Sequence, residues 1–241
     1  MKICINGFKG RMGAAIADEA ASSGHTITGE VDIGDDLKAA LSDSDVVIDF
    51  SLHTVTQSVF EAAAELGKAV ICGTTGHTQE QRAKLLKIAQ AMPTVWAGNY
   101  SIGVNLLCYL TEKAAEILPL SYNAEITEMH HRMKKDAPSG TALMLAESVL
   151  GPRNLSYDDL QHGREGILGE RGEREVGMHS IRGGDVVGDH SVIFADIGER
   201  VELTHRASSR AIFARGAIRA AEWAFGKEAG VYSIRDVLGL K

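Results

Sequence analysis

The first hundred residues alternate short apolar runs with longer helix-like segments, and this alternation limits the folds open to the chain. The apolar runs have the length of strands and cover residues 2–6, 27–32, 45–50, 68–72 and 94–97. An alanine-rich segment ending near residue 23 and segments at about 54–66 and 79–91 have helical character. Strands joined in this way pair in parallel, so the pattern predicts an α/β fold with a doubly wound, Rossmann-like parallel sheet. Ligands of such sheets bind at the carboxyl ends of the strands.

A glycine-rich turn follows the first apolar run. Its glycines, Gly7, Gly10 and Gly13, have the spacing G-x-x-G-x-x-G rather than the common G-x-G-x-x-G. Strand, glycine turn and helix in this order form the opening of a dinucleotide-binding unit. Taken alone, the glycines are explained equally well by a tight turn with close helix packing.

An acidic residue, Asp32, ends the second apolar run at the distance from the glycine turn that is typical of dinucleotide sites. Its carboxylate can accept hydrogen bonds from the adenosine ribose and repel the 2′-phosphate of NADP. Lys9 and Arg11 in the glycine turn partly offset this repulsion. We therefore expect NADH to be preferred and NADPH to be usable.

A cluster of basic side chains, His130, His131, Arg132 and Lys134, precedes a helix-start sequence at residues 138–141. In that sequence, proline pre-sets the first turn, serine or threonine caps it, and glycine lets a ligand approach the free N–H groups. These N–H groups and the helix dipole favour an anion, so the segment predicts a pocket for a small, multiply charged anion with a proton donor. A solvated charged surface is the alternative for the composition alone. In a strand, His130 and His131 would point to opposite faces, so only one could enter the same cleft directly.

Composition argues against several other classes of protein. The net charge of −7 and pI near 5.7 argue against a nucleic-acid binder, which needs an excess of Lys and Arg. Cys4, Cys72 and Cys108 are odd in number and lie in apolar runs, so we expect neither disulfides nor a metal site. The sequence shows no leader segment and no run of about 18 apolar residues. We therefore expect a soluble cytoplasmic protein without a membrane partner.

The second half of the chain begins with a helix at about 104–117, a strand at 123–129 and a helix that ends near Gly151. Residues 153–174 are polar and rich in glycine, and could form a surface excursion or an oligomer arm. Three strand-like runs follow at 176–182, 186–194 and 200–205 and predict an open mixed sheet, which invites pairing with other copies. A last helix from 211 to about 225 returns to the first domain. We therefore expect a dinucleotide-binding domain of residues 1–101 and 211–241, and a substrate-binding and oligomerisation α+β domain of residues 102–210.

The order of residues from Glu128 to Ala142 closely resembles the active-site signature of the dihydrodipicolinate reductase family, which acts in the diaminopimelate route to lysine. Residues 182–190 and 199–210 resemble the family too, and so do the loops at 49–51, 73–76 and 98–103. The resemblance covers essentially the whole chain. It implies that NADH or NADPH reduces a cyclic dicarboxylate derived from (4S)-4-hydroxy-2,3,4,5-tetrahydrodipicolinate to tetrahydrodipicolinate. It also implies a homotetramer assembled through the open sheet.

Roles for individual residues follow from the resemblance. His130 corresponds to the general acid, and Lys134 to the residue that binds and helps protonate the developing anion; which of them delivers the proton stays open. The positions that match substrate-carboxylate contacts are His131, Ser139, Gly140 and Thr141. The positions expected to bind the cofactor are Gly7, Phe8, Lys9, Gly10, Arg11, Met12, Gly13, Asp32, Phe50, Ser51, Gly73, Thr74, Thr75, Gly98, Asn99 and Tyr100. His77 and Tyr100 stand where the family usually has Phe.

Two other functions are compatible with the first half of the chain. One is a nicotinamide-dependent dehydrogenase of an open-chain amino acid or semialdehyde, but this function leaves the segment from His130 to Thr141 unexplained. The other is a nucleotide-binding module without catalysis, against which His130 and Lys134 both argue.

Overall fold

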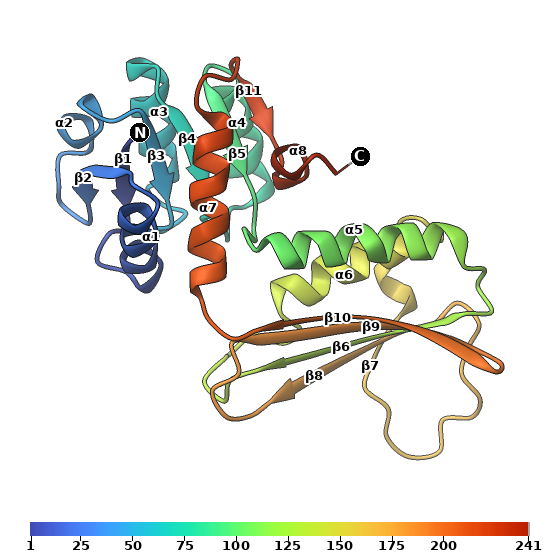
Figure 1. Ribbon diagram of the computed structural model, residues 1–241. Coiled ribbons are helices and arrows are strands. Elements are labelled where there is room, and N and C mark those ends of the chain that lie inside the picture. The colour runs from blue at the N-terminus through green and yellow to red at the C-terminus, as the bar shows by residue number, and fades with distance from the viewer. Residues whose placement is uncertain (241) are drawn as a thin grey trace. The chain divides into compact units, whose positions relative to one another are not determined.

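The computed structural model describes residues 1–240, which form two compact units (Figure 1). The first unit consists of Met1–Ile102 and the chain from Arg210 onward, and the second unit consists of Gly103–Ser209. These limits lie within one residue of those expected from the sequence.

A six-stranded sheet with the order β11-β5-β4-β3-β1-β2 forms the centre of the first unit. Its strands are β1 (Lys2–Asn6), β2 (Thr26–Val31), β3 (Val46–Asp49), β4 (Ala69–Cys72), β5 (Pro93–Trp96) and β11 (Gly230–Tyr232). Every pairing is parallel, which confirms the predicted sheet. All residues of β3 and β4 are buried, and this explains why these strands are continuous apolar runs.

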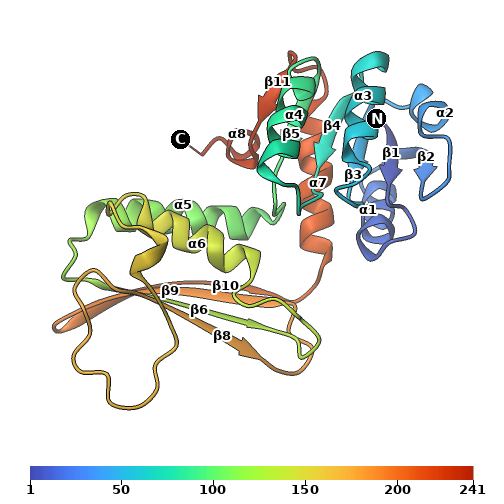
Figure 2. The ribbon, with the colours of Figure 1, turned by 180° about the vertical axis from the view of Figure 1, so that it is seen from behind.

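Helices cover both faces of this sheet (Figures 1 and 2). One layer contains α1 (Arg11–Ser22), α7 (Ala211–Ala224) and α8 (Ile234–Leu238), which share a core with Ile3 and Ile5 of β1. The opposite layer contains α2 (Leu37–Ser42), α3 (Thr56–Leu66) and α4 (Gln79–Ala89), which share a core with Cys4. Side chains alternate between the faces of a strand, so β1 contributes to both cores.

The second unit contains a five-stranded mixed sheet with the order β10-β9-β6-β8-β7. Its strands are β6 (Asn123–His130), β7 (Leu160–His162), β8 (Val176–Arg182), β9 (Gly188–Asp196) and β10 (Glu199–Ala207). The central strand β6 runs parallel to β8 and antiparallel to β9, as predicted for a mixed sheet. Two helices, α5 (Ile102–Ile117) and α6 (Gly140–Leu150), lie on one face of it, the helix-covered face (Figure 1). We call the other face the open face.

One expectation for the second unit needs correction, and the structure adds detail to another. Helix α6 begins at Gly140 with Ser139 as its N-cap, so Pro138 precedes the cap instead of forming the first turn. The region 153–174 is also more regular than its composition suggests. It contains the 3₁₀ helix η1 (Tyr157–Asp159) and β7, which extends the edge of the sheet by pairing with β8.

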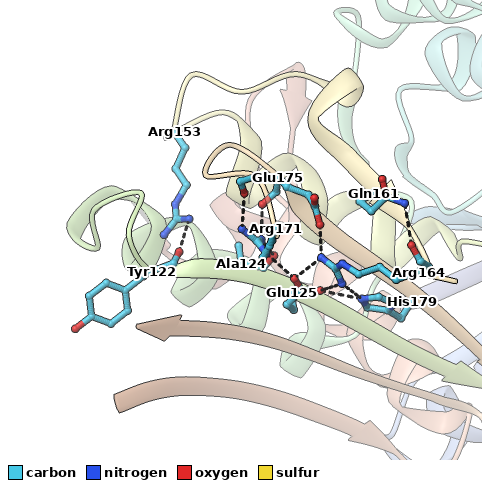
Figure 3. A network of polar contacts seen from close by, with 11 residues as sticks. Tyr122, Ala124, Glu125, Arg153, Gln161, Arg164, Arg171, Glu175 and His179 are labelled. Atoms are coloured by element: carbon cyan, nitrogen blue, oxygen red, sulfur yellow. Dashed lines mark hydrogen bonds and ion pairs between the residues drawn. The ribbon is translucent and has the colours of Figure 1, made fainter. Parts of the chain in front are cut away.

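The loop 163–175, which joins β7 to β8, is attached to the sheet by ionic contacts around Glu125 (Figure 3). Arg164 and Arg171 both bind the Glu125 carboxylate, with N–O distances of 2.8 and 2.9 Å. His179 lies 2.8 Å from the other carboxylate oxygen. Because Ala124 and Ile126 point into the core, Glu125 lies on the open face, and the loop covers part of that face. Among residues 1–240 no helix is long and apolar enough to cross a membrane.

Candidate functional site

The end of β6 carries the first elements of the candidate site. Glu128 and His130 are two residues apart in the strand and continue the row of Ala124 and Ile126, so they lie on the helix-covered face. His131 follows the end of the strand, where its backbone N–H donates to the carbonyl of Val186. The strand therefore directs one histidine of the pair toward the helix-covered face.

Glu128 is buried, with 1% of its surface exposed, and is bound by cationic and polar groups. Arg182 donates to both carboxylate oxygens at 2.8 Å, and the Ser139 N–H donates at 3.2 Å. The His130 Nδ1 atom lies 2.5 Å from Oε2 of the same carboxylate. Burial alone would raise the pKa of Glu128, but the hydrogen bonds from Arg182 and His130 lower it to about 2. The Glu128 carboxylate is therefore ionised at neutral pH and is hydrogen-bonded to Nδ1 of His130.

This contact orients the imidazole of His130. With Nδ1 on the carboxylate, Nε2 is the ring nitrogen left for a substrate, as in other carboxylate–histidine pairs. Gly188 of β9 makes room for that nitrogen, because a Cβ at this position would lie 3.0 Å from it. Burial lowers the pKa of His130, Glu128 opposes this effect, and the charges of Lys134 and Arg182 lower the pKa further. The protonated ring is thus a stronger acid than an ordinary imidazolium.

The start of α6 supplies an anion site beside this pair. Ser139 caps the helix by accepting the Ala142 N–H at 3.2 Å, and its hydroxyl lies 3.1 Å from Nε2 of His190. At the first helical position, Gly140 is exposed, and a Cβ added there would meet open space. The backbone at Gly140 is therefore approachable, and the helix dipole favours an anion there.

Lys134 lies in the turn between β6 and α6. Its ammonium pairs with Asp136 at 2.9 Å, and Asp136 is mostly exposed. The His130 pKa responds to the charge of Lys134, after the larger effects of burial and Glu128. Lys134, His130 and Ser139 thus belong to one local cluster in the second unit.

A cavity of about 540 Å³ in the first unit lies at the carboxyl ends of β1, β2 and β3. Six of the expected cofactor residues line it: Gly7, Lys9, Gly10, Asp32, Phe50 and Ser51. Gly7 has φ +84°, and a Cβ there would lie 2.5 Å from the Phe50 carbonyl oxygen, so only glycine fits. The backbone therefore borders this cavity without side chains, as the approach of a nucleotide requires.

Asp32 is already hydrogen-bonded within this cavity. Its carboxylate accepts the N–H groups of Ile33 at 2.9 Å and of Lys9 at 3.0 Å. These two bonds hold the pKa of Asp32 below its usual value. The side chain thus presents a negative charge to the cavity and also connects β2 to the glycine turn.

Eight of the other ten expected cofactor residues fall into two groups. Gly13, Phe8 and Met12 pack the start of α1 against its neighbours, and a Cβ on Gly13 would lie 2.4 Å from two carbonyl oxygens. Arg11, Thr75 and Gly98 are exposed, while Gly73 and Asn99 are partly buried. For Gly13, the structure shows the close packing that was the alternative explanation of the glycines.

Thr74 and Tyr100 have buried side chains. Thr74 donates to Asp49 at 2.9 Å and accepts the Ser51 N–H at 3.0 Å. The Tyr100 side chain is 1% exposed, and its hydroxyl lies 2.8 Å from the Val95 carbonyl oxygen. The side chain of Tyr100 therefore supports the sheet and does not line the cavity.

Sequence reasoning gave no role to Asp49, Glu128, Arg182 or His190. Asp49 is fully buried and accepts hydrogen bonds from Asn6, Ser51 and Thr74, so it joins the ends of β1, β3 and β4. Burial is the main reason why the Asp49 pKa is raised.

The two-residue spacing of Glu128 and His130 was a signal in the sequence, because such residues share one face of a strand. Arg182 and His190 reach Glu128 and Ser139 from other strands, which no local pattern reveals.

The residues of the structure offer neither a metal cluster nor a disulfide. Among residues 1–240 no group of three or more His, Cys, Asp or Glu side chains could hold a metal ion. Cys4, Cys72 and Cys108 are buried thiols that form no disulfide.

Comparisons with known proteins agree along the whole chain. Two family models match: dihydrodipicolinate reductase, N-terminus, over residues 1–100, and dihydrodipicolinate reductase, C-terminus, over residues 103–238. The 4-hydroxy-tetrahydrodipicolinate reductase of Akkermansia muciniphila is 51% identical, over 100% of this chain and 98% of that protein. The enzyme of the same name from Thiobacillus denitrificans is 44% identical, over 100% of this chain and 99% of that protein.

Solved structures share the fold. The dipicolinate-bound dihydrodipicolinate reductase from Paenisporosarcina sp. TG-14 has a TM-score of 0.79 at 21% identity and covers 97% of each chain. GenD2 from gentamicin A biosynthesis, in complex with NAD, has a TM-score of 0.62 at 13% identity, over 100% of this chain and 90% of GenD2. From the match of both family models and the whole-length relatives, this chain belongs to the dihydrodipicolinate reductase family.

Proposed function

We propose that this chain is a 4-hydroxy-tetrahydrodipicolinate reductase of diaminopimelate and lysine biosynthesis. It transfers hydride from a reduced nicotinamide cofactor to the cyclic dicarboxylate derived from (4S)-4-hydroxy-2,3,4,5-tetrahydrodipicolinate and gives tetrahydrodipicolinate. The relatives of 44–51% identity that carry this name support the reaction. The single structural observation that carries the proposal is the His130–Glu128 pair beside the approachable start of α6.

The second unit binds the substrate, stabilises its negative charge and donates a proton to it. Backbone and hydroxyl groups of Ser139, Gly140 and Thr141 bind a carboxylate at the helix start, and His131 contributes a further contact. The ion pair of Lys134 with Asp136 is partly exposed and therefore weak, so the ammonium can exchange Asp136 for the anionic substrate. Hydride addition leaves negative charge on the substrate, which Lys134 stabilises and His130 or Lys134 neutralises with a proton.

The first unit binds the cofactor, which supplies the hydride when bound. Gly7 and Gly10 leave backbone bare along the cavity wall, and this fits the close approach of a pyrophosphate. The negative charge of Asp32, beside which Asp35 also lines the cavity, favours ribose hydroxyls over a 2′-phosphate. NADH is therefore preferred, and NADPH is usable because Lys9 lies in the same cavity.

We also propose a homotetramer that works in the cytoplasm. The open face of the second unit's sheet supports the assembly, because Ile181 on that face is 49% exposed and offers apolar surface for another copy to bury. A cytoplasmic location is that expected of a biosynthetic reductase.

One coupled assay tests the reaction. The condensation product of aspartate semialdehyde and pyruvate is generated freshly, and oxidation of NADH and of NADPH is followed separately. We expect both to be oxidised, NADH more efficiently. Oxidation with aspartate semialdehyde alone would instead favour an open-chain dehydrogenase, and NADH binding without any oxidation would favour a non-catalytic module.

A further inference from the structure

His190 of β9 lies in the second unit behind the helix start. It is 3% exposed and pairs in register with Glu128 on one side and His205 on the other. Its Nε2 atom lies 3.1 Å from the Ser139 hydroxyl, and its ring packs edge-on against His130 with centroids 5.1 Å apart. Its Nδ1 atom is buried and has no hydrogen-bond partner among residues 1–240.

The protonation of His190 follows from this environment. Burial, followed by the charge of His130, lowers its pKa to about 4, so the ring is neutral at pH 7 and carries one N–H and one lone pair. A proton on Nδ1 would leave a buried N–H unpaired, and such orphan donors are rarer in proteins than orphan acceptors. The favoured tautomer therefore has its proton on Nε2 and donates it to Ser139.

This tautomer determines what the Ser139 hydroxyl can do. A hydroxyl has two lone pairs and one hydrogen. One lone pair accepts the Ala142 N–H of the helix cap at 3.2 Å, and the other accepts the N–H of His190. Only the O–H of Ser139 then remains for a ligand at the start of α6.

We propose that His190 is a positioning residue that fixes the Ser139 hydroxyl as a hydrogen-bond donor to a carboxylate of the substrate. The inference rests on the proposed function, in which Ser139 contacts that carboxylate. A neutral donor bound to a carboxylate makes a stronger hydrogen bond than one between neutral groups. Loss of the fixed orientation should therefore weaken binding of a dicarboxylate by about 10-fold to 100-fold.

Two variants distinguish the effect of the N–H donor of His190 from the effect of its side-chain shape. His190→Gln keeps an N–H near the position of Nε2, and His190→Met has a similar length without a donor. We measure dipicolinate binding to the full-length protein by calorimetry, with NADH present. His190→Met should weaken binding by about 10-fold to 100-fold. His190→Gln should recover most of that loss, and equal weakening by both variants would overturn the inference.

A double-mutant cycle with Ser139→Ala tests whether His190 acts through Ser139. Adding His190→Met to Ser139→Ala should cause little further loss, because the hydroxyl is already absent. If Ser139→Ala binds dipicolinate like the wild type, the carboxylate site of the proposed function is wrong. If Ser139→Ala weakens binding but His190→Met has no effect or adds fully, only the role of His190 is wrong.

A direct measurement does not depend on the folding of any variant. Nitrogen chemical shifts of the His190 ring, from long-range proton–nitrogen NMR correlations on the wild-type protein, distinguish the two tautomers. We expect the Nε2–H form, and the Nδ1–H form would overturn the inference.

Discussion

At the scale of single residues, Lys134 is the cation whose role is most open to a direct test. Lys134→Ala should lower turnover by about 10²–10⁴, the range for loss of a positioned acid. NADH binding should be unchanged, because the cavity proposed for the cofactor lies in the first unit. Turnover and NADH affinity are measured on the same preparation, with Lys135→Ala as the control for an exposed neighbouring lysine. Full turnover in Lys134→Ala would remove this residue from the mechanism.

Glu128 permits a test of which residue delivers the proton. Although burial lowers the pKa of His130, Glu128 raises it, so Glu128→Gln should lower it further. Activity that needs protonated His130 is lost as pH rises through this pKa, and the alkaline fall in turnover should therefore move to lower pH in Glu128→Gln. The pH dependence of kcat at saturating NADH measures this shift. A reduced kcat with an unmoved alkaline limb would indicate that Lys134, not His130, donates the proton.

Gly188 gives a steric test of the same imidazole. In Gly188→Ala the new methyl group would lie 3.0 Å from Nε2 of His130, closer than ordinary van der Waals contact. Displacement of a catalytic group by a fraction of an ångström should lower kcat by about 10-fold to 100-fold. Gly172→Ala is the matched control in the same unit, because its methyl group would lie 3.9 Å from Glu175 Cβ. Equal kcat in both variants would contradict a role for the Nε2 side of the ring.

At this scale the sequence indicates candidate site residues, but it does not reveal the residues that support them. The order of His130, Lys134 and Ser139 indicates a proton donor and an anion site. Arg182 and His190 come from β8 and β9, and they reach the site only because both strands pair with β6. Such pairing depends on the whole sheet, so a single stretch of sequence does not reveal it.

At the scale of elements, the strength of local patterns decided what could be predicted. Buried parallel strands such as β3 and β4 are continuous apolar runs, and amphipathic helices such as α7 have a clear periodicity, so both were found. The unexpected elements α2, α8 and β11 have six residues or fewer. Helices this short are stabilised by packing against the rest of the protein, and their own sequences carry little signal.

The loop 163–175 shows how one carboxylate can hold an element in place. The pKa of Glu125 lies at about 2 because hydrogen bonds from Arg164, His179 and Arg171 outweigh the effect of burial. Its usual pKa is 4.5, so the contacts contribute stability that is complete above pH 5 and is lost as pH falls toward 2. This shift corresponds to about 3 kcal/mol at neutral pH.

Glu125→Gln should therefore destabilise the protein at neutral pH. We expect the free energy of unfolding to fall by up to about 3 kcal/mol at pH 7, and the difference from the wild type to shrink near pH 3. Urea unfolding at both pH values measures the effect. Glu173→Gln, an exposed acid of the same loop, serves as the control. A difference from the wild type that is independent of pH would contradict an ionic role for Glu125.

At the scale of the whole molecule, helix α7 explains why the first unit is built from two separate segments of the chain. Its apolar stripe packs on the sheet of the first unit, so the chain must return there after the second unit. This return could be predicted from the sequence, because a long amphipathic helix needs an apolar surface to cover. The assembly of several copies is harder to predict from local sequence patterns. It depends on the shape and polarity of a surface that exists only after β6, β8, β9 and β10 have paired.

The proposed tetramer makes the open face the decisive surface. Ile181 of β8 lies on this face and is 49% exposed, which leaves apolar surface for another copy to bury. Ile181→Asp would place a charge there, and burying an unpaired charge is costly, so the assembly should dissociate. Sedimentation of the full-length protein should give the mass of four chains for the wild type and a smaller mass for this variant. Ile117→Asp on α5, at a site that is 78% exposed, is the control and should remain tetrameric. A wild type that sediments as a single chain would refute the tetramer, and dissociation of Ile117→Asp alone would move the interface from the open face to the helices.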